Sequence, residues 1–174
     1  MRKVLFIFGE LTDSDVEWLA SAGERVHLTA GTTLISLGSR VEHLYIVLDG
    51  QLSIRSAAGA HLARLESGEI VGEMSLVDPA PTAVSVEVSA DATVLRIPDT
   101  TLRDKLAADF PFAARFYRAI CVFLADRMRA TTRRMGYGES QAQDASKDEL
   151  NENVLDTVHL AGARFDRMLK KLAG

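Results

Sequence analysis

The sequence predicts a mainly β domain, a sandwich or barrel, with helices before and after it. Turn residues recur every 7 to 12 positions between Glu24 and Ile97. These turns are Ala30-Gly31, Leu37-Gly38, Asp49-Gly50, Ala58-Gly59, Ser67-Gly68 and Pro79-Ala80-Pro81. Between them apolar and polar residues alternate, as in the Val-Ser-Val-Glu-Val-Ser run at 84–89. Period-2 segments between closely spaced turns are typical of β-sandwiches and barrels.

The sequence before Glu24 predicts a short apolar segment followed by a helix. An apolar run at residues 4–8 is too short for a signal peptide or a membrane span, so we expect it to pack on the domain. A helix begins after Thr12, whose hydroxyl can cap it, with Asp15 three positions later. Gly23 ends that helix, and its apolar face carries Val16, Leu19 and Ala20.

The strongest hairpin signal in the β region is Asp49-Gly50. Directly after it, the apolar residues Leu52 and Ile54 alternate with polar residues, as in a strand with one buried face. Because Asp-Gly favours two-residue hairpin turns, the sequence predicts a tight turn between two strands at this point.

Helical character returns near Asp99. A short helix covers residues 100–106 and stops before Pro111, which suits the first turn of a long helix reaching about Met135. Apolar residues recur along this helix at spacings of three and four: Phe112, Phe116, Ala119, Ile120, Phe123, Leu124 and Met128. The opposite side is mostly basic, with Arg115, Arg118, Asp126, Arg127 and Arg129. One face must be buried, on the barrel or on a second copy, and we expect a homodimer through the helix 112–135.

The chain after Met135 predicts a linker and one more helix. Residues 136–148 begin with Gly-Tyr-Gly and are rich in polar residues, as linkers are. A last helix is expected from Asp148 to Leu172. We therefore divide the chain into a domain at 1–135, a linker at 136–148 and a helical extension at 149–174. The sequence does not say whether this extension folds back or crosses to a neighbouring copy.

The composition narrows the function. The chain has 174 residues, and 24 acidic against 20 basic residues give a net charge of −4. That charge argues against DNA as a partner, because phosphate binding needs a basic surface. The single cysteine, Cys121, excludes an internal disulfide and suits a cytoplasmic protein. It lies in the apolar stretch of the long helix, where we expect it to be buried and unreactive.

No catalytic or metal-binding pattern is found in the sequence. His27, His43 and His61 fall on separate strand regions, and no two histidines stand two residues apart as cupin metal sites require. No nucleophile elbow accompanies the serines. We therefore expect neither a metal site nor an enzyme.

The segment most informative about function is Gly68–Val77, followed by Pro81–Val86. Strand-like ends flank a Gly-Glu turn and one short helical turn. This arrangement places backbone N–H groups and the carboxylate of Glu73 around a small cavity, where a carboxylate can accept a hydrogen bond from a sugar hydroxyl. No arginine stands in the segment to bind a phosphate.

From about Leu11 to Met135 the sequence resembles the cyclic-nucleotide-binding domain family, the effector domain of catabolite-activator-like proteins. The resemblance is carried by Ala30–Ile35, Leu44–Gly50 and Gly68–Leu76. It implies a double-stranded β-helix jelly roll of eight strands with an N-terminal helix, a long C-terminal helix and, in this chain, an extra terminal helix. It also implies a stand-alone domain, since only 39 residues follow Met135, too few for the helix-turn-helix domain of the family's transcription regulators.

The resemblance also assigns ligand-binding residues. It implies that Glu73 binds a ribose hydroxyl and that backbone groups are offered by Gly72, Met74 and Ser75. Thr82 stands where the family has an arginine for the cyclic phosphate, and Ala83 stands where a serine or threonine often follows. We therefore expect weak binding of cAMP or cGMP, unless Arg55 or Arg64 supplies the missing charge.

These residues favour a non-enzymatic regulatory module that binds a small nucleotide-like ligand and signals through its C-terminal helices to another protein. The cofactor is unknown, a cyclic nucleotide being one candidate. The alternative is a dimerisation or protein-interaction module with a degenerate pocket. In that case Glu73 would only cap the short helical turn, and Thr82 would only satisfy local backbone groups.

Overall fold

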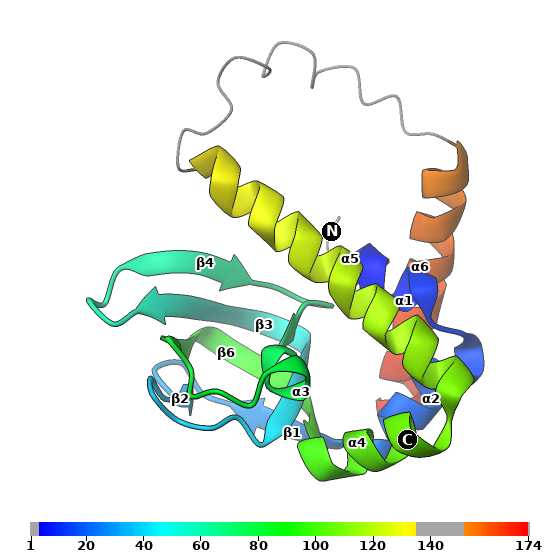
Figure 1. The fold of residues 1–174 in the computed structure, drawn as a ribbon, viewed down its shortest axis with the longest axis horizontal. Coiled ribbons are helices and arrows are strands. Elements are labelled where there is room, and N and C mark those ends of the chain that lie inside the picture. Colours follow the sequence, from blue (N-terminus) through cyan, green and yellow to red (C-terminus); the bar gives the residue numbers. More distant parts are fainter. Residues whose placement is uncertain (1–3, 135–151, 174) are drawn as a thin grey trace.

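The computed structural model describes residues 4–134 and 152–173 (Figure 1). The helices are α1 (Val4–Glu10), α2 (Asp13–Ala22), α3 (Met74–Val77), α4 (Asp99–Ala108), α5 (Phe110–Arg134) and α6 (Glu152–Ala173). The strands are β1 (Glu24–Leu28), β2 (Thr33–Ile35), β3 (His43–Ser56), β4 (His61–Leu65), β5 (Ile70–Val71) and β6 (Val84–Pro98). The linker 136–148 and the start of the extension at 149–151 lie outside the described residues.

The strands form one antiparallel sheet in the order β1-β6-β3-β4, with β2 also paired to β6 and β5 to β3. This sheet with its flanking helices confirms the expected fold class, a jelly roll of the cyclic-nucleotide-binding type. Its strand count differs, because the described residues hold six strands and not eight. Strand β3 runs without interruption where a turn between two strands was expected, and β6 is also one long strand.

The hairpin predicted at Asp49-Gly50 is wrong. Both residues lie inside β3, which continues along β6 with register shifts between residues 47 and 52. Gly50 has a φ of +83°, and a Cβ there would come within 2.1 Å of the Asp91 carbonyl oxygen on β6. A β-bulge of the G1 type places a glycine in the left-handed conformation, as a tight hairpin turn does, so the dipeptide alone could not distinguish the two.

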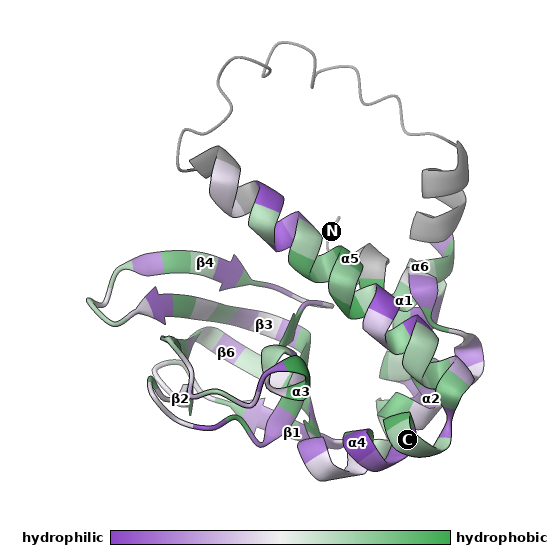
Figure 2. Ribbon diagram, in the orientation of Figure 1, coloured by the Kyte–Doolittle hydropathy of each residue, from purple (hydrophilic) through white to green (hydrophobic). Residues whose placement is uncertain are grey.

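Two hydrophobic cores follow from the alternation along the strands. Leu44 and Ile46 of β3 point into a core shared with the helices, whereas Tyr45 and Val47 point into the barrel. The helical core gathers the buried faces of α1, α2, α4, α5 and α6. Figure 2 shows α5 alternating between hydrophobic and hydrophilic residues, as expected for a helix with one buried face.

The N-terminal predictions are confirmed. The apolar run lies in α1, where Ile7 and Phe8 are buried. A capping box begins α2: the Thr12 hydroxyl accepts from the Asp15 N–H, and the Asp15 carboxylate accepts from the Thr12 N–H. The Asp15 carboxylate also receives two hydrogen bonds from Arg115 of α5, which fixes the first half of α5 to α2.

The aromatic stripe of α5 is covered within the chain. Phe112, Phe116 and Phe123 are buried in the helical core, where α1 packs along α5. We expected a second copy of the chain to cover this stripe, because it exceeds what one small barrel covers. In the structure helices of the same chain, α1, α2 and α4, cover it instead, so the stripe itself does not require a dimer. Cys121, expected to be buried, is exposed on another face of the helix.

The last helix packs on the N-terminal helices of the same chain (Figure 1). Phe165 of α6 meets the Phe8 ring at a centroid distance of 5.4 Å. Arg164 donates to the Asp13 carboxylate and to the backbone carbonyls of residues 8 and 9. In this structure, therefore, α6 folds back.

Candidate functional site

A cavity of about 300 Å³ opens beside α3, at the start of β6. Its walls come from the barrel interior, from the segment 71–75, from the loop 78–83 and from one residue of α5. The lining residues are Ile35, Val41, Ile54, Val71, Gly72, Glu73, Met74, Ser75, Asp78, Ala80, Pro81, Thr82, Ala83, Val84, Val86 and Arg127. All six residues proposed from the sequence lie around this cavity.

Gly72 turns the chain from β5 into α3. Its φ is +93°, a conformation that L side chains rarely adopt. A Cβ at this position would lie 2.4 Å from the His43 carbonyl oxygen, so β3 and the turn pack too closely for a side chain. This tight turn places the next residue, Glu73, at the floor of the cavity.

Glu73 is nearly inaccessible, at 1% exposure, and its partner is a cation from α5. The Arg127 guanidinium donates from Nη1 to Glu73 Oε1 at 2.7 Å. Glu73 occupies the N-cap position of α3 but makes no side-chain capping hydrogen bond to it. Burial raises the pKa of Glu73, and the charge and hydrogen bond of Arg127 oppose that rise without cancelling it.

Arg127 is the functional residue that sequence reasoning missed. Its guanidinium also stacks over the Phe123 ring, 4.9 Å from the centroid. In the sequence it looks like part of the basic, solvated side of a long helix, and 54 residues separate it from Glu73. The one available signal was the acid itself, because a buried carboxylate requires a cation or hydrogen-bond donors.

The loop carrying Thr82 is fastened to the neighbouring loop 36–39. The Thr82 hydroxyl donates to the Ser36 carbonyl, its N–H donates to the Ser39 carbonyl, and its carbonyl accepts from the Gly38 N–H. Thr82 thus satisfies local backbone groups, as one of the two sequence-based interpretations expected. Ala83 adds no polar side chain to the cavity mouth.

The hydroxyl of Ser75 is also occupied, since it donates to the Gly72 carbonyl at 2.7 Å. Met74 is 61% exposed at the cavity edge. Arg55 and Arg64 are not among the lining residues, and Arg55 lies 2.7 Å from Glu87 on the barrel surface. Neither arginine replaces the charge that the sequence lacks at Thr82; the guanidinium in the cavity belongs to α5.

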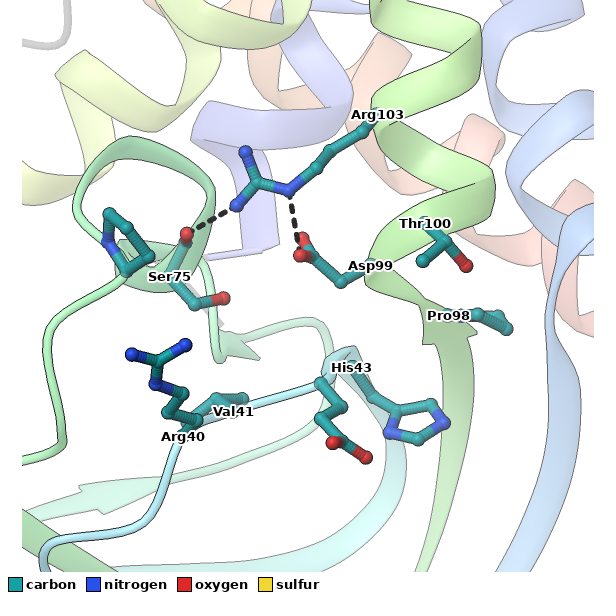
Figure 3. A pocket seen from close by; sticks show the side chains of 10 residues that line it. Arg40, Val41, His43, Ser75, Pro98, Asp99, Thr100 and Arg103 are labelled. Carbon is teal, nitrogen blue, oxygen red and sulfur yellow. Dashed lines mark hydrogen bonds and ion pairs between the residues drawn. The ribbon is translucent and has the colours of Figure 1, made fainter.

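A second, larger cleft of about 550 Å³ lies between α3 and the start of α4 (Figure 3). Arg103 reaches across it, with Nε 2.7 Å from Asp99 Oδ2 and Nη2 donating to the Ser75 carbonyl at 2.6 Å. These contacts fix α3 to α4. The two cavities share Val41 and Ser75, so α3 forms part of the boundary between them.

The described residues hold no group of three or more potential metal ligands. Among the same residues, no helix is both long and apolar enough to cross a membrane.

Comparisons with known proteins agree with this geometry. The model of the cyclic nucleotide-binding domain family matches residues 25–109. An uncharacterised NTE family protein of Mycobacterium bovis is 28% identical over 128 residues, which are 74% of this chain and 22% of that protein. The Pycsar effector protein XpPycTIR of Xanthomonas perforans is 29% identical over 113 residues, which are 64% of this chain and 36% of the effector. The chain thus spans about a fifth to a third of the length of these relatives.

A solved structure shows the same fold. A cyclic nucleotide-binding domain from Methylobacillus flagellatus superposes with a TM-score of 0.68 at 20% identity, covering 76% of this chain and 80% of that one. The strand order, the glycine turn before α3 and the cavity beside it are consistent with the family match. Residues 25–109 of this chain belong to the cyclic nucleotide-binding domain family.

Proposed function

We propose that this chain is a non-enzymatic regulatory module that binds a small ligand in the Glu73 cavity and passes its occupancy to another protein through α5 and α6. The ion pair between Glu73 and Arg127 carries the proposal. It is a direct polar link between the cavity floor and the long helix.

The two halves of α5 are held by different contacts, so a change at the Glu73 cavity can act on one half. Helices α1 and α4 are its main neighbours, and Arg115 fixes its first half to α2 through Asp15. Its second half reaches the cavity through Arg127. A ligand group that competes with Arg127 for Glu73 weakens the contact that holds this half of α5. The ligand then binds with different affinity to the two positions of the helix, and signalling requires such a difference.

Cyclic nucleotides are expected to bind weakly. A hydrogen bond to a charged group contributes about 1.5–3 kcal/mol, and a bidentate arginine–phosphate pair lies at the strong end. With Thr82 at the arginine position, binding of cAMP or cGMP should be about ten- to several-hundred-fold weaker than in a family member that has the arginine. Calorimetric titration with cAMP, cGMP and cyclic dinucleotides measures this directly.

Breaking the ion pair should move α5 even without a ligand. Cys121, the chain's single cysteine, is exposed on α5 and accepts a spin label. A second label on Ala58→Cys, in the exposed turn between β3 and β4, reports the distance from the barrel. We expect Arg127→Met to shift or broaden this distance distribution, measured by double electron–electron resonance.

The matched control is Arg118→Met. Arg118 lies on the same helix and pairs with Glu10 at 2.9 Å, away from the cavity. This variant should leave the distance unchanged. An unchanged distribution in Arg127→Met would remove the basis for signalling through α5.

A second candidate function, a dimerisation module, is favoured by one observation. An exposed stripe runs along α5 and consists of Phe110, Tyr117, Cys121 and Met128. Its spacings of seven, four and seven residues place these side chains on one face of the helix, as in a coiled-coil seam. We propose this face as the homodimer contact, in place of the aromatic stripe buried within the chain.

Sedimentation equilibrium tests the contact. We expect the wild type to dimerise and Tyr117→Lys/Met128→Lys to be monomeric, because two charges per helix would then face their copies. Leu37→Lys/Leu62→Lys, which places two lysines at exposed leucines of the barrel, should still dimerise. A monomeric wild type at high concentration would reject this second function.

A further inference from the structure

We infer that the Glu73 cavity accepts an uncharged, mainly apolar small molecule and discriminates against anions, including cyclic phosphates. This inference rests on the proposed function, since it names the ligand class of the same cavity. It is carried by the charges, the hydrogen bonds and the apolar walls of the lining residues.

The charged side chains of the lining do not favour an anion. They comprise two carboxyl groups, Glu73 and Asp78, and the single guanidinium of Arg127. The guanidinium is already bound to Glu73 at 2.7 Å, and only a quarter of the arginine side chain is exposed. A ligand anion would share the cation with a carboxylate in a cavity of about 300 Å³, where like charges repel strongly.

The neutral polar side chains are occupied as well. Thr82 and Ser75 both donate their hydroxyl hydrogens to backbone carbonyls. The N–H of Thr82 is likewise committed to a carbonyl of the neighbouring loop. These groups are therefore not free to replace the water shell of a phosphate.

The remaining wall is hydrocarbon. Ten of the sixteen lining residues have aliphatic, proline or methionine side chains: Ile35, Val41, Ile54, Val71, Met74, Ala80, Pro81, Ala83, Val84 and Val86. Apolar surface of this kind binds by releasing water from itself and from an apolar ligand. The Arg127 guanidinium carries N–H groups besides the one that binds Glu73, and these can donate to one hydroxyl or amide oxygen of that ligand.

Two probes of similar size and different charge test the inference. We expect 1-naphthol, which is neutral at pH 7, to bind saturably in calorimetric titration. The anion 1-naphthoate should bind at least about tenfold more weakly, because it places a carboxylate beside those of the lining. cAMP should also bind more weakly than 1-naphthol. Naphthoate or cAMP binding more tightly than naphthol would overturn the ligand class.

Two variants locate the binding. Val84→Trp fills the cavity from β6 and should abolish naphthol binding, whereas Val77→Trp, at an exposed valine of α3 outside the lining, should preserve it. Thr82→Arg adds a cation to the cavity mouth and should raise naphthoate affinity at least about tenfold. Naphthol binding that persists in a folded Val84→Trp protein, or a Thr82→Arg protein without gain for naphthoate, would contradict the inference.

The spin-label distance separates this inference from the proposed function. Naphthol binding that leaves the Cys121–Ala58→Cys distance unchanged would uphold the ligand class and reject signalling through α5. If a cyclic nucleotide changes the distance and naphthol does not bind, signalling through α5 is upheld and the ligand class is rejected.

Discussion

Replacing Arg127 by methionine should lower the free energy of unfolding by about 3–5 kcal/mol, because the variant leaves a buried carboxylate without its cation. Glu73 is 1% exposed and has no capping hydrogen bond to fall back on. Methionine keeps much of the arginine's apolar stem, so the loss reports the missing charge more than missing packing. Chemical denaturation at neutral pH measures it.

The controls isolate the buried charge. Arg118→Met removes an ion pair whose arginine is 72% exposed, and exposed pairs contribute at most about 1 kcal/mol. The double variant Glu73→Gln/Arg127→Met removes both charges and should recover most of the stability. Equal losses in Arg127→Met and Arg118→Met would show that Glu73 does not depend on its partner.

The destabilisation of Arg127→Met should also depend on pH, in a direction set by the pKa of Glu73. Burial raises the pKa of Glu73 above its ordinary value of 4.5, against the influence of Arg127. The folded protein therefore holds this proton more tightly, and the resulting stability is present below pH 4.5 and lost as the pH rises through the raised pKa. Without Arg127 the pKa should rise further, so the destabilisation of Arg127→Met should shrink as the solution is acidified.

Replacing Gly72 by alanine should destabilise the fold by more than about 1–3 kcal/mol, the typical cost of forcing an L residue into a rare backbone conformation. At Gly72 that cost is increased by a collision, since the new Cβ would lie 2.4 Å from the His43 carbonyl oxygen. Relief requires the turn to move away from β3. The displaced turn carries Glu73, so the Arg127 Nε–H signal in NMR spectra should shift together with the loss of stability.

Gly59→Ala is the matched control. Gly59 also has a positive φ, +78°, but a Cβ there would meet nothing within 4 Å. Its substitution should cost only the backbone strain and leave the Arg127 signal in place. If the two alanine variants were equally stable, close packing of the turn against β3 would not be what requires glycine at residue 72.

Much of the fold could be predicted because its signals are local. The Thr12 cap, the alternation from Val84 to Val88 and the proline at the start of α5 each act within a few residues, and each has its expected structural counterpart. Prediction was wrong where one local signal serves two structures. Asp49-Gly50 provides the positive φ of either a turn or a bulge, and the pairing of β3 with β6 selects the bulge.

In the candidate site, too, the local features were predictable from the sequence and the contacts between distant residues were not. The sequence alone indicated six of the sixteen residues that line the cavity, because the glycine turn, the acid after it and the proline-rich loop are close together in the chain. Only the tertiary structure decided that Arg127 pairs with Glu73 and that α1, α2 and α4 help to cover the aromatic stripe of α5. Such contacts depend on how whole helices pack, and no spacing along the chain encodes which distant side chain a buried charge will meet.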